Sequence, residues 1–285
     1  MNRTLAAAGA ALLALLALSG CSPATPAATT TPTATRTPAA GPALPAALTP
    51  SAITALPATE YDAVIPGLIP APAEPRITGT STVAFDTPVY GEDFTTAVAR
   101  IPAKDFLGKP TVVVPVATKG DWSMVLTASR RILPSQAADG ASAPAQTAAW
   151  VPSSALTTTG PLTHRIVVSV STQTLTITDA KGKVQQSFPV GVGTAQTPTP
   201  TGATGYLQAR YLDPAQGQST HRIQLTSLHA TAADEPYGGS DGGLIGIHYQ
   251  DVASGAVSHG CVRLGADAIA AVDALSLGTP VTVVD

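Results

Sequence analysis

The segment Ile245–Leu264, IGIHYQDVASGAVSHGCVRL, gathers the side chains of this 285-residue chain that could carry out nucleophilic chemistry. Cys261 follows a His-Gly pair, and His248 ends a short apolar run. A thiol attacks a carbonyl carbon as a thiolate, so it needs a base within hydrogen-bond reach and donors for the oxyanion that forms. His248 or His259 could be that base. Gly260 lacks a Cβ atom, so it would leave room for a substrate and for backbone N–H donors near Cys261.

Two other interpretations of these side chains remain open. His248, His259 and Cys261 could bind zinc, and His229 would then be the fourth ligand. The close His-x-Cys spacing and the lack of a second cysteine pair disfavour such a metal site. Cys261 could also be an inert buried residue, which is common for a lone cysteine.

The first of the two cysteines, Cys21, bears on whether Cys261 can form a disulfide. Residues 1–20 join a basic start to an apolar run and small residues, which is typical of a secretory signal. The run is shorter than the roughly 20 apolar residues of a membrane span. Leu18-Ser19-Gly20-Cys21 resembles the bacterial lipobox, which implies lipidation of Cys21 after cleavage. Cys261 would then be an unpaired thiol in an exported protein, which indicates a reactive group.

Composition predicts how the rest of the chain is divided. The formal net charge is only −3, so no nucleic-acid footprint is visible. From Ser22 to Thr59 the only charged residue is Arg36, and Ala, Thr and Pro dominate. Such a stretch buries too little apolar surface to offset its ordering entropy. We therefore predict a signal peptide over residues 1–20, followed by a lipid anchor and disordered linker over residues 21–75.

Short β-type runs separated by Gly, Pro and Asp clusters begin near Arg76 and predict a small β-domain over residues 76–160. Its two tryptophans, Trp122 and Trp150, are expected to anchor the core, because a small domain needs large apolar side chains. The sequence segments around these tryptophans resemble those of bacterial SH3-like modules. The resemblance implies a small SH3-like β-barrel.

A second β-domain is predicted over residues 161–285, where HRIVVSV and TLTITD alternate apolar and polar residues as antiparallel strands do. Only Ala266–Leu275 has helical periodicity. The glycines of Gly191–Gly202 could suggest a dinucleotide loop, but no helix pattern follows, so we expect a flexible loop. His164 and His221 have polar neighbours and are expected at the surface.

A family resemblance rests on Ser258-His259-Gly260-Cys261-Val262-Arg263, preceded by IGIH. These residues are similar to the signature of L,D-transpeptidase catalytic domains, the YkuD family, and the resemblance extends over about Thr163–Asp285. It implies an antiparallel β-sandwich with one short helix. It also implies that Cys261 is the nucleophile, that His248 is the base, and that the carbonyl group of Tyr249 holds the imidazole. The supporting positions of the motif fall on Ser258, His259, Gly260 and Arg263.

The resemblance implies a cell-wall enzyme at the cell envelope, anchored through Cys21. Its donor would be a peptidoglycan tetrapeptide stem, held as a thioester on Cys261 until the amine of a neighbouring stem forms a 3→3 cross-link. It needs no metal or organic cofactor, and carbapenems are possible inhibitors. Two alternatives stay open: a carboxypeptidase that hydrolyses the same acyl-enzyme, and a non-catalytic wall-binding lipoprotein.

Overall fold

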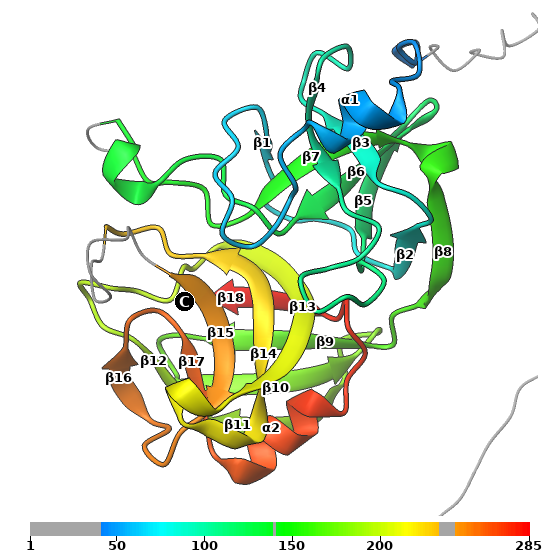
Figure 1. The fold of residues 1–285 in the computed structure, drawn as a ribbon. Helices are drawn as coiled ribbons and strands as arrows, with labels where there is room; N and C mark the ends of the chain where they lie inside the picture. The colour runs from blue at the N-terminus through cyan, green and yellow to red at the C-terminus, as the bar shows by residue number, and fades with distance from the viewer. Residues whose placement is uncertain (1–40, 139–140, 234–242) are drawn as a thin grey trace, which may run out of the picture. The chain divides into compact units, whose positions relative to one another are not determined.

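A computed structural model of the protein describes residues 41–138, 141–233 and 243–285 (Figure 1). The predicted signal peptide, Cys21 and the first part of the predicted linker lie outside these residues. In the described part, strands predominate and the α-helices are α1 (Pro50–Thr54) and α2 (Ala266–Asp273). The prediction of a mainly β protein is confirmed. No helix in these ranges is long and apolar enough to cross a membrane.

The N-terminal part, residues 41–161, is built around an antiparallel sheet with strand order β4-β3-β7-β6-β5, and β1 pairs with β7. Its strands are β1 (Ile69–Pro70), β3 (Thr87–Tyr90), β4 (Ala97–Ile101), β5 (Val114–Lys119), β6 (Trp122–Thr127) and β7 (Thr147–Pro152). A separate ladder joins β2 (Gly79–Val83) to β8 (Leu156–Pro161). Two 3₁₀ turns, η1 (Pro134–Gln136) and η2 (Ser153–Ala155), complete this part.

Both tryptophans lie in the core of the N-terminal part, as expected from the sequence. Trp122 is fully buried, and its ring meets the rings of Tyr90 and Phe94 edge to face at centroid distances of 5.1 and 5.2 Å. Its Nε1–H donates to the carbonyl oxygen of Pro42 at 2.9 Å, which satisfies the one polar group of the side chain. That these strands form an SH3-like barrel stays a prediction.

The structure differs from the expected disordered linker over residues 41–75. Ile65, Leu68 and Ile69 are buried in the core, although their segment shows no periodic pattern. The backbone of the same stretch is also bonded to the folded part: Ile65 N–H donates to the carbonyl of Arg130 at 2.9 Å. Only a few apolar side chains of this segment are buried, so its overall composition did not indicate their burial.

The C-terminal part is a ten-stranded sheet with order β11-β10-β9-β18-β13-β14-β15-β17-β12-β16. Three neighbouring pairs are parallel, namely β9 with β18, β15 with β17, and β12 with β16. The antiparallel pairing expected for HRIVVSV and TLTITD is confirmed in β9–β11, and β13, β14 and β15 also pair antiparallel. The strands are β9 (His164–Ser169), β10 (Thr174–Asp179), β11 (Val184–Pro189), β12 (Gly191–Gly193), β13 (Ala203–Asp213), β14 (Gln218–His229), β15 (Leu244–Tyr249), β16 (Gly255–Ser258), β17 (Val262–Leu264) and β18 (Pro280–Val284).

The core of the C-terminal part is formed by alternate residues of these strands and by one face of α2. Ile245 and Ile247 of β15 point into this core, so the residues between and beside them face the other way. Ile269 and Val272 of α2 are buried in the same cluster. The helix at Ala266–Asp273 agrees with the periodicity of the sequence.

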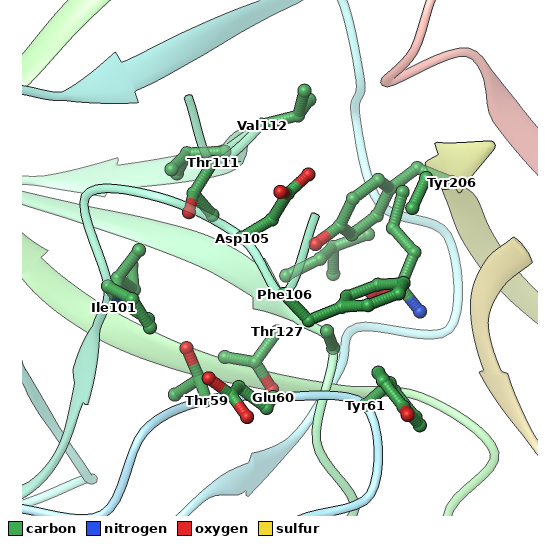
Figure 2. Close-up of a pocket in the computed structure, with 16 residues that line it drawn as sticks. Thr59, Glu60, Tyr61, Ile101, Asp105, Phe106, Thr111, Val112, Thr127 and Tyr206 are labelled. Carbon is green, nitrogen blue, oxygen red and sulfur yellow. The ribbon is translucent and has the colours of Figure 1, made fainter. Parts of the chain in front are cut away.

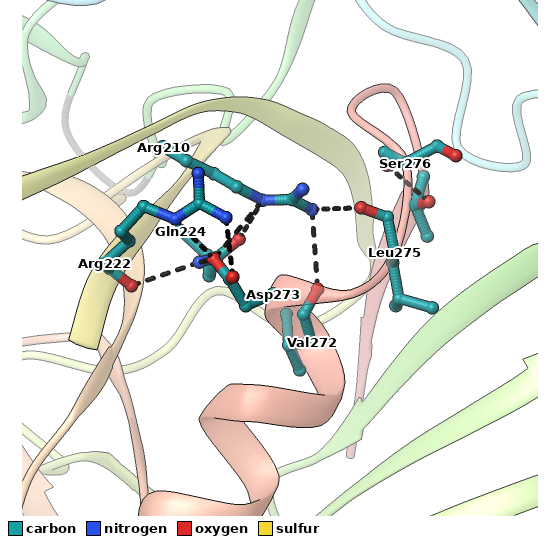
Figure 3. A network of polar contacts seen from close by, with 8 residues as sticks. Arg210, Arg222, Gln224, Val272, Asp273, Leu275 and Ser276 are labelled. Atoms are coloured by element: carbon teal, nitrogen blue, oxygen red, sulfur yellow. Dashed lines mark hydrogen bonds and ion pairs between the residues drawn. The ribbon is translucent and has the colours of Figure 1, made fainter.

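Polar contacts fasten the C-terminal end of α2 to strands β13 and β14 (Figure 3). Arg210 donates to the carbonyl oxygens of Val272 and Leu275, and Arg222 donates to both carboxylate oxygens of Asp273 at 3.0 and 2.6 Å. Cations are favourable at this end of a helix, because its last carbonyl groups have no partner within the helix.

Candidate active site

Strands β15 and β17 bring the predicted nucleophile and base to one face of the sheet. They run parallel, with Ile247 beside Val262 and His248 beside Arg263. One residue back along both strands, Gly246 lies beside Cys261, and a Cβ atom at Gly246 would be 3.9 Å from the sulfur. Because side chains alternate along a strand, Gly246 and His248 face the same side, away from the core. The side chains of Cys261 and His248 are therefore diagonal neighbours.

Cys261 is a free, half-buried thiol. Its Sγ donates to the carbonyl oxygen of Leu244 at 3.6 Å, and no hydrogen bond joins it to His248 within the described residues. Burial raises the pKa of the thiol, while a backbone hydrogen bond from Gly246 and the charge of Arg263 act in the opposite direction. The resting sulfur is therefore protonated at neutral pH.

His248 is held through one ring nitrogen. Its Nδ1–H donates to the carbonyl oxygen of Tyr249 at 3.0 Å, which leaves Nε2 as the unprotonated nitrogen of the neutral ring. Burial lowers the pKa of His248, the hydrogen bond to Tyr249 raises it, and the charge of Arg263 lowers it. The imidazole is thus neutral at pH 7 and able to take a proton.

The Tyr249 carbonyl has a second donor. Gln218, at the start of β14, is only 5% exposed, and its Nε2 donates to this oxygen at 3.0 Å. The 3₁₀ turn η3 (Pro214–Gln216) and Gly217, whose φ is +75°, lead the chain into Gln218. The tyrosine ring packs on the His221 ring at a centroid distance of 4.6 Å, and its hydroxyl donates to Asp251. His221, which we expected at the surface, is half-buried against this tyrosine ring.

The turn that carries the thiol depends on Gly260. Its φ is +106°, a region that L residues with a side chain rarely adopt, and a Cβ atom there would lie 2.9 Å from Ile245 Cδ1. The buried Ser258 Oγ donates to the Cys261 carbonyl at 2.6 Å and accepts the Gly260 N–H at 3.2 Å. His259, between them, is exposed.

A threonine loop after β12 clamps this turn. Thr199 is 1% exposed, and its hydroxyl accepts the Gly193 N–H at 2.9 Å and donates to the Gly260 carbonyl at 2.8 Å. Thr197 donates to the Ser258 carbonyl at 3.1 Å. The expectation of a flexible loop over 191–202 is therefore not supported at Thr197 and Thr199, which are bonded to the nucleophile's turn.

Residues 163–283 match the family model of YkuD, described as the L,D-transpeptidase catalytic domain. The chain carries an L,D-transpeptidase catalytic domain of the YkuD type. No curated protein matches the chain.

The chain is similar to several solved L,D-transpeptidases at low sequence identity. L,D-transpeptidase 1 of Mycobacterium tuberculosis is 20% identical over 49% of this chain and 78% of that chain, with a TM-score of 0.32. An L,D-transpeptidase of Mycobacterium smegmatis is 15% identical over 74% and 100%, with a TM-score of 0.33. L,D-transpeptidase 3 of Mycobacterium tuberculosis, in complex with a faropenem-derived adduct, is 15% identical over 61% and 91%, with a TM-score of 0.35. The identification of the domain rests on the family match.

His229, the fourth residue of the zinc interpretation, is engaged with the N-terminal part of the chain. His229 is 1% exposed at the end of β14, and its Nε2–H donates to the carbonyl of Tyr61 at 3.0 Å. Burial and then the charge of Arg130 lower its pKa to about 4. Among the described residues, no three or more His, Cys, Asp or Glu side chains are grouped as metal ligands would be. The zinc interpretation therefore has no geometric support.

The candidate site includes residues that the sequence did not indicate. Gln218 donates to the Tyr249 carbonyl that holds His248, and Thr199 donates to the Gly260 carbonyl in the turn. Leu244 and Gly246 lie beside the sulfur of Cys261. Leu244 precedes the IGIH run and Gly246 lies within it, so strand pairing could have identified them. Gln218 and Thr199 act through single hydrogen bonds from distant segments and carry no sequence motif.

Proposed function

We propose that this protein is a cell-wall L,D-transpeptidase that forms 3→3 peptidoglycan cross-links through a thioester on Cys261. The observation that carries the proposal is the Cys261 thiol on the same sheet face as His248, whose Nδ1 is bonded to the Tyr249 carbonyl. The match of residues 163–283 to the L,D-transpeptidase catalytic domain supports the substrate class.

The first half-reaction acylates the enzyme. The sulfur leaves the Leu244 carbonyl by rotation about χ1, and His248 Nε2 takes the thiol proton. The thiolate then attacks the carbonyl carbon between the third stem residue and the terminal D-alanine. Collapse of the tetrahedral intermediate breaks the peptide bond, and the leaving amine of D-alanine takes the proton from His248. The products are the Cys261 thioester and free D-alanine.

The second half-reaction transfers the acyl group. An amine of a neighbouring stem attacks the thioester carbon, His248 takes a proton from that amine, and the thiolate leaves. The proton returns from His248 to sulfur, so the enzyme is regenerated and a new amide bond remains. Water in place of the amine would give the carboxypeptidase reaction.

The supporting residues act on the position and charge of the sulfur. Ser258 and Gly260 fix the turn that carries the thiol, as their hydrogen bonds and the positive φ indicate. Arg263 favours the thiolate through its charge. His259 is exposed beside the nucleophile and is proposed to contact substrate rather than to take the proton.

We also propose that the protein is exported and anchored by lipid on Cys21, with the N-terminal part acting as an SH3-like module. The basic start, the apolar run and the Leu-Ser-Gly-Cys sequence support this. Cys21→Ala should release the protein from membranes or leave the signal unprocessed. Recovery of the wild-type chain as a freely secreted protein without lipid would contradict the anchor.

Mass spectrometry of reaction products tests the proposed activity. The purified protein is incubated with a stem tetrapeptide, with and without a second stem that supplies an amine. We expect a cross-linked dimer and released D-alanine when the amine is present. A shortened tripeptide under both conditions would establish the carboxypeptidase instead, and no turnover would favour the wall-binding alternative.

A further inference from the structure

A small cavity between the N-terminal part and strand β13 is lined by carboxylate, hydroxyl and aromatic side chains (Figure 2). Its volume is about 40 Å³, which is room for about three water-sized groups. Glu60, Asp105, Phe106 and Thr111 of the N-terminal part line it, and Ala209 of β13 closes it. A space of this size excludes a sugar ring but admits the end of an unbranched chain.

The polar groups of the cavity lack partners of opposite charge. The half-buried Glu60 carboxylate has no hydrogen bond or ion pair within the described residues. Asp105 Oδ1 accepts the N–H groups of Leu107 and Lys109, both at 2.9 Å, so that carboxylate is fixed by its own turn. The hydroxyl oxygen of Thr111 is buried and has no hydrogen-bond partner in this part of the chain. A buried hydroxyl without a partner is costly, so these walls suit a ligand that donates hydrogen bonds.

Aromatic rings connect the cavity to the active-site face. The Tyr61 and Phe106 rings meet edge to face at 4.8 Å, and Phe106 meets Tyr211 of β13 at 5.8 Å. Rings of this kind attract cations through the negative charge of their faces. Carboxylates, an acceptor hydroxyl and aromatic rings together favour a primary ammonium group over an anion or a neutral ring. The acidic groups are too few for a metal site, in line with the lack of any such cluster in the described residues.

Strand register relates the cavity to Cys261. Ala209 of β13 pairs with Leu225 of β14, which pairs with Gly246 of β15, which lies beside Cys261. The cavity and the sulfur are thus on one sheet face, separated by three strand spacings or about 14 Å. Burial raises the pKa of Tyr211, and the charges of Tyr61, Asp213 and Cys261 raise it further, in keeping with this arrangement.

We propose that this cavity is a substrate subsite that binds a primary ammonium group carried by the peptide about 14 Å from the reacting carbonyl. Glu60 accepts hydrogen bonds from the ammonium at one end of the cavity, Thr111 and Asp105 present further acceptors at the other end, and Phe106 between them packs on the methylenes (Figure 2). The identity of the ligand as a stem peptide rests on the proposed function, whereas binding of the ammonium group does not. The N-terminal part thereby contributes to specificity.

Binding of Nα-acetyl-lysine amide, followed by NMR chemical shifts, tests the subsite without any turnover. Nα-acetyl-norleucine amide has a similar side chain without the charge and is the control ligand. We expect shifts at Glu60, Phe106 and Thr111 with the lysine probe, and much smaller ones with norleucine. Failure here would overturn the subsite and leave the transpeptidase proposal intact.

Three variants connect the binding to the cavity walls. Glu60→Gln should weaken lysine-probe binding about tenfold, since hydrogen bonds to charged groups are the strong ones. Thr111→Val should also weaken it while leaving the protein at least as stable, because the lost hydroxyl has no partner. Glu92→Gln, the same change at an exposed position outside the cavity, should have no effect. Equal affinity in Glu60→Gln and Glu92→Gln, or equal binding of the two probes, would contradict the proposal.

Discussion

Cys261 and His248 are both neutral in the resting site, because burial raises the pKa of the thiol and lowers that of the imidazole. The thiol is bonded to the Leu244 carbonyl and not to the imidazole. In the proposed reaction, the thiolate therefore forms only when the sulfur turns toward His248. A protonated thiol is also less prone to oxidation, since oxidation follows thiolate character.

The roles of the two histidines can be separated by substitution. His248→Ala should slow acylation by a stem peptide about 10²–10⁴-fold, which is the usual contribution of a general base. His259→Ala should slow it less, because His259 is exposed and the hydrogen bond to the Tyr249 carbonyl belongs to His248. Rapid-mixing measurements of D-alanine release would compare them. A larger loss in His259→Ala would exchange the two assignments.

Gln218 is a positioning residue for the base, and its substitution should change the pH profile. Removing its donor with Gln218→Leu leaves the Tyr249 carbonyl to His248 alone, so this oxygen accepts more strongly from Nδ1–H. The pKa of His248 should then rise, because that bond stabilises the imidazolium.

Burial holds the pKa of His248 below its usual value, and the acidic limb of kcat/KM that reports this pKa should move to higher pH in Gln218→Leu. A merely structural role would lower the melting temperature without moving this limb. An unchanged limb in a stable variant would show that Gln218 does not act through the base.

At the scale of elements, the site is a parallel strand pair held by a threonine loop. The 12 residues between Tyr249 and Val262 include β16, which pairs elsewhere, so β17 can return beside β15 in the same direction. Thr199 then joins β12 to the turn of Gly260. The nucleophile is thus positioned from both its own strand and a loop about 60 residues earlier.

Substitution of Thr199 should affect the protein through this junction. Thr199→Val keeps the shape but leaves the Gly193 N–H and the Gly260 carbonyl unpaired in a buried place. We expect a loss of about 1–3 kcal/mol in the free energy of unfolding, together with slower acylation. Thr199→Ser keeps the hydroxyl and should retain most of both. Denaturant unfolding measures the difference, and equal stability of the two variants would contradict the clamp.

The sequence was informative where chemistry and local pattern coincide. The motif around Cys261 and the run ending at His248 located the site, and apolar periodicity located α2. The parallel partners of β9, β12 and β15 were not predictable, because a local pattern does not distinguish parallel from antiparallel pairing. Gln218 gave no signal either, since one buried amide after a turn has no characteristic spacing.

At the scale of the whole molecule, the segment before residue 76 is part of the fold and contributes to the site's surroundings. The backbone carbonyl oxygen of Tyr61 accepts a hydrogen bond from the Nε2–H of His229 in β14. The neighbouring residue Glu60 lines the cavity beside β13. The low-complexity composition of the N-terminal stretch predicted a spacer as far as residue 75. The boundary differs because Ile65 and Leu68 are buried in a core cluster formed with later strands.

The buried His229 should make this arrangement sensitive to acid. Its pKa is about 4 in the folded protein and near 6.5 in the unfolded chain, so the unfolded state binds more protons between these values. The stability contributed by neutral His229 is fully present above pH 6.5 and is lost as the pH falls toward 4, at most by about 1.4 kcal/mol per pH unit.

His229→Gln removes this titration and should flatten the dependence of unfolding free energy on pH between 6.5 and 4. Denaturant titrations at several pH values give the slope directly. The variant is expected to be less stable at pH 7, because the bond to the Tyr61 carbonyl changes, but its slope should still be smaller. Parallel slopes for the two proteins would show that His229 is not the group responsible.

Intact-mass measurement of a carbapenem adduct tests the nucleophile most directly. A carbapenem presents a strained acyl group that imitates the donor carbonyl, and opening of its ring by Cys261 leaves a stable thioester. The wild-type protein should gain one drug mass, mapped by peptide analysis to the segment containing Cys261. Cys261→Ala should remain folded, because the site is only half-buried, and should gain none. An adduct that persists in folded Cys261→Ala, or a wild-type protein that never acylates, would contradict the assignment of Cys261 as the nucleophile.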